Sequence, residues 1–368
     1  MSEGARARDL GIVIGTLSSG PADAITDVTG VRVGHTTLIE GRSVRTGVTV
    51  VLPHDGNPGR DPVFAGSHRL NGNGEMTGLE WVRESGLLSS PIALTNTFSV
   101  GVVRDELVAT GLTSGLPVVA ETFDGGLNDI YGMHVRPEHL RAALEVARGT
   151  NDGAEVDEGS VGGGTGMICH DFKGGIGTAS RVVPADAGGY TVGVLVQANH
   201  GRRERLRVNG VPVGERVTGA EVPPPVEQDW PVGGRARSDR RTEGPGSIII
   251  LVATNAPLLP GQCDRLAQRA GFGVARTGGV GEHSSGDLIL AFSTANRSLQ
   301  VGESGPEGNH EIPIRMLSDA YITPLFDAVI DATEEAIVNA LLAARTMGGH
   351  SGTAYALDGD TLLGAMNA

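Results

Sequence analysis

Short apolar and β-branched runs, separated by glycine, aspartate and asparagine, dominate the first half of the chain. This pattern is typical of strands, which are predicted over residues 31–33, 48–52, 92–97, 116–122, 175–183 and 190–198. Helical spacing predicts two helices, over 101–111 and 137–148, and the second carries Leu140, Ala143, Leu144 and Ala147 on one face. No repeat of 20–50 residues is visible, so solenoids and propellers are excluded.

The amino-acid composition changes at residues 218–246, which hold five prolines and five glycines with almost no apolar periodicity. Composition predicts an exposed, poorly ordered tether there. Residues 247–253 then form an apolar run after one serine, which predicts a strand buried on both faces. A helix over 257–270, a strand over 287–292 and a helical stretch over 316–345, broken near Pro324, complete a compact α/β piece spanning 247–368.

Composition narrows the class of protein. The formal net charge is −14, which disfavours nucleic acid as a partner because phosphates would be repelled. The two cysteines, Cys169 and Cys263, cannot build a disulfide framework and fit a reducing compartment. Neither a secretory signal nor an apolar run of membrane-spanning length is apparent. We therefore expect a soluble cytoplasmic protein without a membrane partner.

The junction Gly246-Ser247 has two interpretations. The segment before it has the composition of an ordinary interdomain linker, which is the simpler interpretation. However, the hydroxyl of Ser247 stands at the first position of a predicted buried strand, directly after a glycine whose carbonyl is unshielded. Attack of that hydroxyl on the carbonyl would shift the acyl group from nitrogen to oxygen, and water would then release a new chain beginning at Ser247. Its α-amine, with an ordinary pKa of about 7.7–8, could activate the adjacent hydroxyl.

A second polar cluster lies at residues 281–287, where His283, Ser284, Ser285 and Asp287 crowd a glycine-rich turn. Such a turn could present Ser285 and Asp287 on one side, because Gly286 between them imposes little direction. A carboxylate can accept a hydrogen bond from one hydroxyl, and that hydroxyl can in turn contact a nucleophile. Such an arrangement would orient and polarise the nucleophile. The alternative is a polar turn whose side chains bond their own backbone, and His283 alone indicates a surface residue.

Other candidate motifs are weaker. The glycine clusters at 72–78 and 162–167 lack both the dinucleotide-binding spacing and the ending of a Walker loop, so no nucleotide cofactor is expected. Asn199 is either a turn residue at a strand end or an amide donor to an oxyanion. Cys169, His170 and Asp171 are adjacent rather than spaced as metal ligands usually are, so neither a metal site nor any cofactor is expected.

Several long blocks in order make the chain resemble the DmpA/BapA family, the L-aminopeptidase D-amidase/D-esterases and β-peptidyl aminopeptidases. The resemblance runs almost end to end and is carried by DLGIVIGTLSSGPADAITDVTGVRVGHTTL, GNGEMTGLEWV, DGGLNDI, GGGTGM, FKGGIGTASR and GPGSIIILVATNAPLLP. It implies a four-layer αββα sandwich and cleavage of a precursor before Ser247. The two fragments, 1–246 with the tether 218–246 and 247–368, would together form one domain and assemble further, often as a tetramer of such pairs.

The resemblance also implies roles for individual residues. Ser247 matches the nucleophile, Ser285 and Asp287 the supporting serine and acid, and Asn199 the oxyanion donor, with Asp287 standing where several members carry glutamate. One position departs from the family. Gly126 replaces a tyrosine of the DG-x-LND block, which puts the substrate range in question; substrate contacts are expected from Gly126, Phe123 and Tyr131.

These implications describe a self-cleaving serine aminopeptidase or amidase that releases N-terminal residues from short peptides, amino-acid amides or esters. Two alternatives remain at this stage. The same scaffold could serve an acyltransferase that passes the acyl group to an amine. It could also be a non-catalytic ligand-binding relative, for which the loss of the tyrosine at Gly126 is the best argument.

Overall fold

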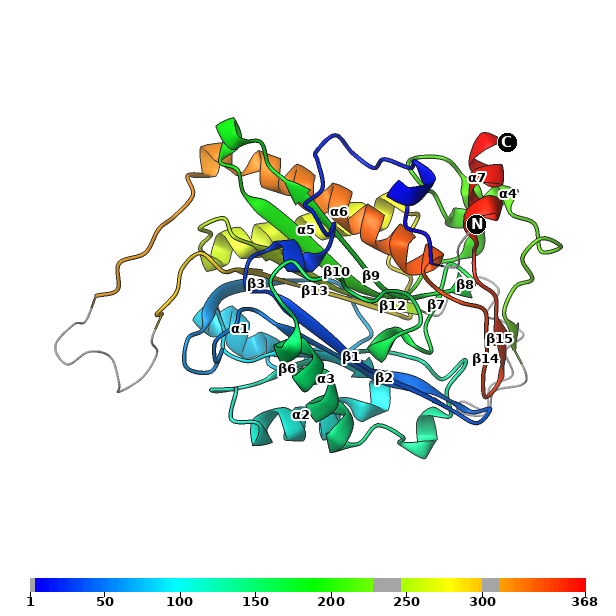
Figure 1. Ribbon diagram of the computed structural model, residues 1–368, viewed down its shortest axis with the longest axis horizontal. Coiled ribbons are helices and arrows are strands. Elements are labelled where there is room, and N and C mark those ends of the chain that lie inside the picture. Colours follow the sequence, from blue (N-terminus) through cyan, green and yellow to red (C-terminus); the bar gives the residue numbers. More distant parts are fainter. Residues whose placement is uncertain (1–3, 228–245, 300–310) are drawn as a thin grey trace.

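Two β-sheets lie face to face at the centre of the molecule, and helices cover their outer faces (Figure 1). The computed structural model describes residues 4–227, 246–299 and 311–368. In order, the layers are helices, a six-stranded sheet, a four-stranded sheet and helices, so the predicted four-layer αββα sandwich is confirmed.

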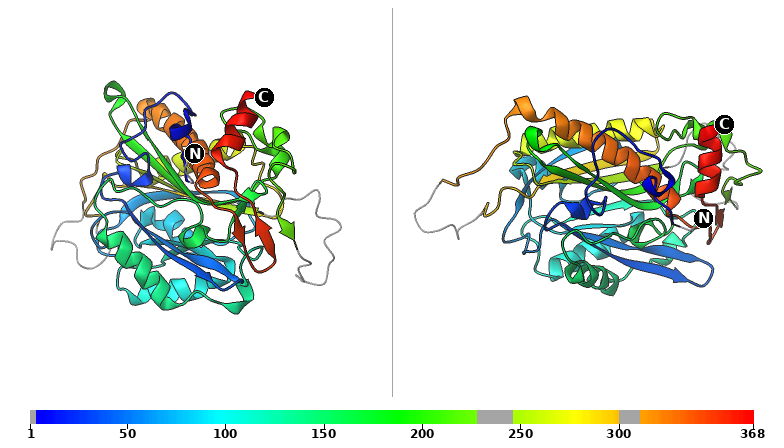
Figure 2. Two further views of the ribbon diagram at one scale, coloured as in Figure 1. Left: turned by 45° about the vertical axis from the view of Figure 1, so that its right-hand side comes forward. Right: turned by 45° about the horizontal axis from the view of Figure 1, so that its top comes forward.

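The six-stranded sheet has the order β4-β3-β13-β12-β10-β9. Its strands are β3 (Val63–Gly72), β4 (Leu87–Leu88), β9 (Gly175–Val182), β10 (Thr191–Asn199), β12 (Gly246–Thr254) and β13 (Ser285–Ser293). β12 and β13 run parallel, and α5 (Pro260–Arg276) connects them, whereas the other neighbours in this sheet are antiparallel. The helices α5 and α6 (Thr323–Leu342) cover the outer face of this sheet (Figure 2).

The four-stranded sheet has the order β1-β2-β5-β6. Its strands are β1 (Arg32–Glu40), β2 (Val44–Leu52), β5 (Ile92–Asn96) and β6 (Val118–Thr122). The helices α2 (Val100–Ala109) and α3 (Pro137–Gly149) pack on its outer face through an apolar core that includes Leu140, Ala143, Leu144 and Ala147. The remaining elements are α1 (Leu79–Ser85), β7 (Ile168–Cys169), β8 (Phe172–Lys173), α4 (Val213–Arg216), β11 (Val226–Glu227), β14 (Met347–Gly348), β15 (Gly352–Ala354) and α7 (Gly359–Asn367).

The strand predicted over 247–253 is β12, and its unbroken apolar run has a direct structural cause. Ile248 and Ile250 point into the core beneath α5 and α6, whereas Ile249 and Leu251 point into the core between the sheets. A strand buried on both faces has no side facing solvent, so its sequence does not alternate between apolar and polar residues. β12 and β13 are central strands of the same sheet as β3, β9 and β10, so residues from 247 onward share one sheet with the first half of the chain.

Two predicted elements need correction. The helical stretch over 316–345 is not broken at Pro324; α6 begins at Thr323, and Pro324 lies in its first turn, where a missing N–H costs nothing. The tether at 218–246 is only partly as predicted, and its residues 228–245 lie outside the described part. Residues 218–221 are exposed, but Val222 is buried and β11 pairs with β15. Backbone pairing needs no apolar periodicity, which is why composition missed it.

Within the described ranges, no helix combines the length and the apolar character needed to cross a membrane.

Candidate active site

The predicted site residues meet where three neighbouring strands end. The register pairs Asn199, the last residue of β10, with Ser247 near the start of β12. On the other side of β12, Gly246 pairs with Ser285 and Ser247 pairs with Gly286. Residues separated by up to 88 positions (199 to 287) are thus brought to one edge of one sheet, and all three strands are held there by ladder hydrogen bonds.

Ser247 lies against the peptide bond that it is predicted to attack. Its Oγ is 2.8 Å from the carbonyl oxygen of Gly246 and donates a hydrogen bond to it. The backbone N–H of Gly286 donates to the same Oγ at 3.2 Å. A Cβ on residue 246 would lie 2.7 Å from the Cα of His200 and 2.8 Å from the carbonyl oxygen of Asn199. Only glycine therefore fits before the serine in this packing.

Ser285 and Asp287 interact as predicted, but a strand and not a turn brings them together. Both belong to β13, whose alternation puts residues two apart on one face, and the Ser285 Oγ donates to Asp287 Oδ1 at 2.5 Å. Because Ser247 pairs with Gly286, its side chain lies on the opposite face of the sheet from the side chains of Ser285 and Asp287. The pair therefore flanks the backbone at Gly246-Ser247, beside the nitrogen that would become the α-amine, rather than the hydroxyl itself.

The environment of Asp287 changes its acidity. Burial raises the pKa of this carboxyl to about 6, against the lowering effect of hydrogen bonds from Ser285 and the backbone of Ile248; the charge of Glu282 raises it further. A carboxylate with a pKa close to neutrality is suited to accept and return a proton. His283, by contrast, is exposed in the turn before β13.

The amide of Asn199 is held from both ends. Its Oδ1 accepts the backbone N–H of Ile168 at 2.8 Å, and its Nδ2 donates to the carbonyl oxygen of Phe123 at 3.1 Å. An amide nitrogen has two hydrogens, so one N–H remains for a further acceptor. Since Asn199 and Ser247 are paired, their side chains lie on the same face, as an oxyanion donor and its nucleophile require.

The three residues expected to contact substrate are dispersed around this point. Phe123 follows β6, is 39% exposed and offers its carbonyl to Asn199. Gly126 is exposed, and a Cβ there would meet only Ile168 Cδ1, at 3.3 Å, so a side chain is tolerated. Tyr131 packs against Phe98, with ring centroids 5.2 Å apart. The structure thus brings Phe123 and Gly126 close to the Asn199 end of the site, and places Tyr131 at a neighbouring cavity.

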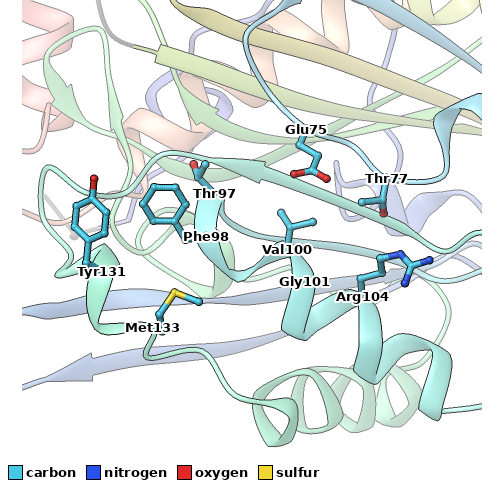
Figure 3. A pocket seen from close by; sticks show the side chains of 9 residues that line it. All are labelled: Glu75, Thr77, Thr97, Phe98, Val100, Gly101, Arg104, Tyr131 and Met133. Carbon is cyan, nitrogen blue, oxygen red and sulfur yellow. The ribbon is translucent and has the colours of Figure 1, made fainter. Parts of the chain in front are cut away.

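That cavity has a volume of about 600 Å³ and is lined by residues from three segments of the chain (Figure 3): Glu75, Thr77, Thr97, Phe98, Val100, Gly101, Arg104, Tyr131 and Met133. Gly74 precedes Glu75 of the cavity lining and is close to the catalytic edge. A Cβ on Gly74 would be 3.0 Å from Gly286 Cα and 3.3 Å from Glu121 Oε1, so the carboxylate of Glu121 and the backbone of Gly286 both lie close to this glycine.

Glu121 is a candidate site residue that sequence reasoning missed. The residue is 3% exposed, and its carboxylate accepts hydrogen bonds from the backbone N–H of Glu75 at 2.9 Å and from the hydroxyl of Thr97. Burial raises its pKa. The available signal was a glutamate inside the predicted strand 116–122, because an acid in a buried strand needs an explanation.

Lys173 stabilises the chain segment that contacts Asn199. It is the only lysine of the chain, is fully buried, and donates from Nζ to the carbonyl oxygens of Gly174 at 2.7 Å and Met167 at 3.0 Å. Burial lowers its pKa to about 7. These bonds fix the segment that presents the Ile168 N–H to Asn199.

The glycine cluster at 162–167 serves close packing, since a Cβ on Gly164 would be 2.4 Å from the backbone nitrogen of Ile176.

Comparisons with known proteins agree with this geometry. The chain is 50% identical to a β-aminopeptidase of a Burkholderia species, with a TM-score of 0.87 over 99% of this chain and 98% of that one. It is 39% identical to the L-aminopeptidase D-Ala-esterase/amidase of Ochrobactrum anthropi, described as a prototype for the serine aminopeptidases and a variant of the Ntn hydrolase fold; the TM-score is 0.82, and 98% of each chain is covered. The curated β-peptidyl aminopeptidase BapA of Sphingosinicella microcystinivorans is 47% identical, over 95% of this chain and 89% of the relative.

The fold and the serine at its sheet edge therefore define a serine aminopeptidase on an Ntn hydrolase scaffold. The model of peptidase family S58 matches residues 23–355, and the chain belongs to that family.

Proposed function

We propose that the chain cleaves itself between Gly246 and Ser247, giving fragments 1–246 and 247–368 that remain one folded domain. The observation that carries this proposal is the contact of Ser247 Oγ with the Gly246 carbonyl, at a position where only glycine fits. The fragments would stay together because β12 and β13 are central strands of the shared sheet. N-terminal sequencing of the purified protein tests this, and a fragment beginning at Ser247 is expected.

In the cleaved enzyme, Ser247 Oγ attacks the acyl carbonyl of the substrate. The new α-amine of Ser247 takes the proton, and the Ser285–Asp287 pair beside it orients that amine and stabilises its charged form. The free N–H of Asn199 and the backbone N–H of Gly286 are the donors nearest to the developing oxyanion. The C–N bond of the substrate then breaks, and the ammonium group of Ser247 returns its proton to the departing amine. Water hydrolyses the ester on Ser247, which releases the acid and regenerates the enzyme.

The proposed substrates are short peptides and amino-acid amides with a free N-terminal amine, including β-amino acids. The relatives named as β-aminopeptidases support the β-amino acid, and the O. anthropi relative supports amides and esters. Glu75 in the cavity and buried Glu121 beside it supply negative charge for the ammonium group. Comparing release of ammonia from β-alanine amide, L-alanine amide and N-acetyl-alanine amide tests this; the acetylated amide should be inert.

The two alternatives from the sequence are not favoured. The family and its named relatives are peptidases, which argues against a non-catalytic ligand-binding protein. An acyltransferase would differ in its acceptor, so product analysis with added amines separates it from a hydrolase. A tetramer of cleaved pairs and a cytoplasmic location also remain proposals; light scattering of the cleaved protein tests the first. The buried free thiols of Cys169 and Cys263 support the second.

Replacing Asn199 with alanine is expected to lower kcat by about 10²–10³, because one oxyanion donor is lost. KM for the amide should change little, since the donor acts on charge that develops in the transition state. Steady-state kinetics on pre-cleaved protein measure this. A variant Gln262→Ala, which removes another buried amide but one on α5, is the control; equal losses in both would mean general damage to the fold.

Replacing Gly126 with tyrosine is expected to raise kcat/KM on alanine amides and to lower it on amides with bulky side chains. The new phenol would stand beside Ile168, at the Asn199 end of the site, and narrow it. One hydrogen bond to a charged group contributes about 1.5–3 kcal/mol, roughly ten- to hundredfold in rate. Tyr131→Phe measured in parallel shows whether Tyr131 already does this task. If neither variant changes the substrate range, the missing tyrosine has no bearing on specificity here.

A further inference from the structure

A second group of reactive side chains lies directly behind the catalytic edge. Cys169, His170 and His200 each offer one ligand atom, and these atoms lie within 4.8 Å of one another. All three residues are buried, with exposed fractions of 0%, 0% and 3%. The proposed catalysis uses none of them. The sequence hid this group, because only the fold brings His200, at the end of β10, beside the adjacent pair Cys169 and His170.

The backbone at His170 is unusual. His170 and Asp171 are the two central residues of the β7–β8 hairpin and have φ values of 49° and 58°. Few residues other than glycine adopt this conformation, and histidine, asparagine and aspartate do so more often than the rest. In this turn the imidazole of His170 lies against Gly201, where a Cβ would come within 2.4 Å of the ring.

The two imidazoles keep buried nitrogens without partners. His170 Nδ1 lies 3.1 Å from the carbonyl oxygen of Arg202, which can only accept, so Nδ1 carries the proton and Nε2 carries a lone pair. Within the described part of the chain, neither His170 Nε2 nor His200 Nε2 has a hydrogen-bond partner. The bond to a backbone carbonyl is the usual outer contact of a metal-binding histidine.

Cys169 Sγ is 3.8 Å from His200 Nδ1. With metal–sulfur and metal–nitrogen bonds of about 2.3 and 2.0 Å, two ligand atoms around one tetrahedral ion lie roughly 3.5 Å apart. The sulfur–Nδ1 pair is close to this separation, whereas the three ligand atoms together lie within 4.8 Å and would move closer on binding an ion. We propose that Cys169, His170 and His200 form a binding site for one soft, thiophilic metal ion, Zn²⁺ or Cu⁺, which ties the β7–β8 hairpin to the end of β10.

Binding replaces the S–H bond of Cys169 by a sulfur–metal bond and releases one proton. One thiolate and two neutral imidazoles with Cu⁺ give a neutral complex, which burial tolerates best, whereas Zn²⁺ leaves one positive charge and needs a fourth ligand beyond these three buried residues. The ion would hold Ile168, and through its N–H the amide of Asn199, without touching substrate. The expected effect is therefore on the rigidity of the oxyanion side.

The test uses the full protein purified from cells grown with added zinc or with added copper under reducing conditions. Elemental analysis should find about one ion of one of these metals per chain, and loaded protein should melt about 5 °C higher than protein prepared with a chelator. Cys169→Ser should reduce the content at least tenfold. Wild-type protein that carries less than about a tenth of an ion per chain from both media would overturn the proposal.

Two further variants separate metal binding from packing. His170→Asn keeps the turn, because asparagine accepts a positive φ, but removes the nitrogen ligand, so the metal should be lost with the fold intact. Cys263→Ser alters the other buried cysteine, on α5, and should keep the metal. Equal loss of metal in the Cys263 and Cys169 variants, or full retention in His170→Asn, would contradict the assignment.

Discussion

Replacing Ser247 with alanine is expected to leave the protein as one uncut chain without aminopeptidase activity. Alanine has no oxygen to attack the Gly246 carbonyl, so neither the acyl shift nor later catalysis is possible. Loss of the nucleophile in a serine hydrolase lowers kcat by about 10⁶. Denaturing electrophoresis with N-terminal sequencing measures the first effect, and hydrolysis of an amino-acid amide measures the second.

Ser247→Thr is the matched control, because threonine keeps a hydroxyl at the same position. It should still cleave, more slowly, since its extra methyl group must fit a site in which Ser247 is only 5% exposed. An uncut wild-type chain that hydrolyses amides would exclude the N-terminal nucleophile. Cleavage in the alanine variant would show that the Gly246-Ser247 bond is broken by another agent.

Replacing Asp287 with asparagine is expected to lower kcat by about 10²–10⁴, because the carboxylate that orients the α-amine of Ser247 and stabilises its charged form is lost. The pH profile should change as well. In the uncleaved chain the carboxyl has a pKa of about 6, and the ammonium group that cleavage creates on Ser247 favours the carboxylate, so the rate should fall as the pH drops below about 6. The asparagine variant has nothing to titrate at that position, so this limb should disappear from its profile.

Stability gives an independent control on the same variant. Burial raises the pKa of Asp287 above its unfolded value of about 3.9, so between about pH 4 and 6 the folded state binds the proton more strongly. This group therefore favours folding below pH 4 and loses that contribution as the pH rises through 6. Asp287→Asn should be at least as stable as the wild type at pH 7. A less stable variant would mean that the lost activity reflects damage to the strand end.

Glu282→Gln separates charge from geometry. The charge of Glu282 raises the pKa of Asp287, so its removal should move the acidic limb to lower pH while the maximal rate stays nearly the same. An acidic limb unchanged in both variants would assign that limb to a different group.

Local chemistry made the site residues visible in the sequence. Ser247 is conspicuous because its hydroxyl directly precedes an unbroken run of apolar residues. Such a run is typical of a strand buried on both faces and can be recognised in a single sequence. Ser285 and Asp287 were found for a partly wrong reason. A glycine-rich turn was expected to bring them together, whereas β13 begins at Ser285 and its alternation does so. Gly286 obscured the strand because glycine is rare inside strands.

Other features depend on contacts that no local pattern encodes. β3 was not predicted, because the polar residues at its end interrupt the alternation, yet it lies between β4 and β13. Glu121 is a candidate site residue only because it lies close to Gly74 and Gly286, which come from distant segments of the chain. The approach of His200 to Cys169 likewise follows from the pairing of β10 with β12 and from the position of the β7–β8 hairpin.

The single, inaccessible lysine makes the chemistry of the nucleophile unusually easy to follow. Lys173 is the only side-chain amine of the chain, and it is sealed inside the fold. Apart from the amine at the start of the chain, cleavage before Ser247 would create the sole reactive amine of the native protein. A mild acylating reagent would then act as an active-site label, because each molecule modified at Ser247 is a molecule whose base has been removed. Counting modified amines by mass would titrate competent active sites without any substrate.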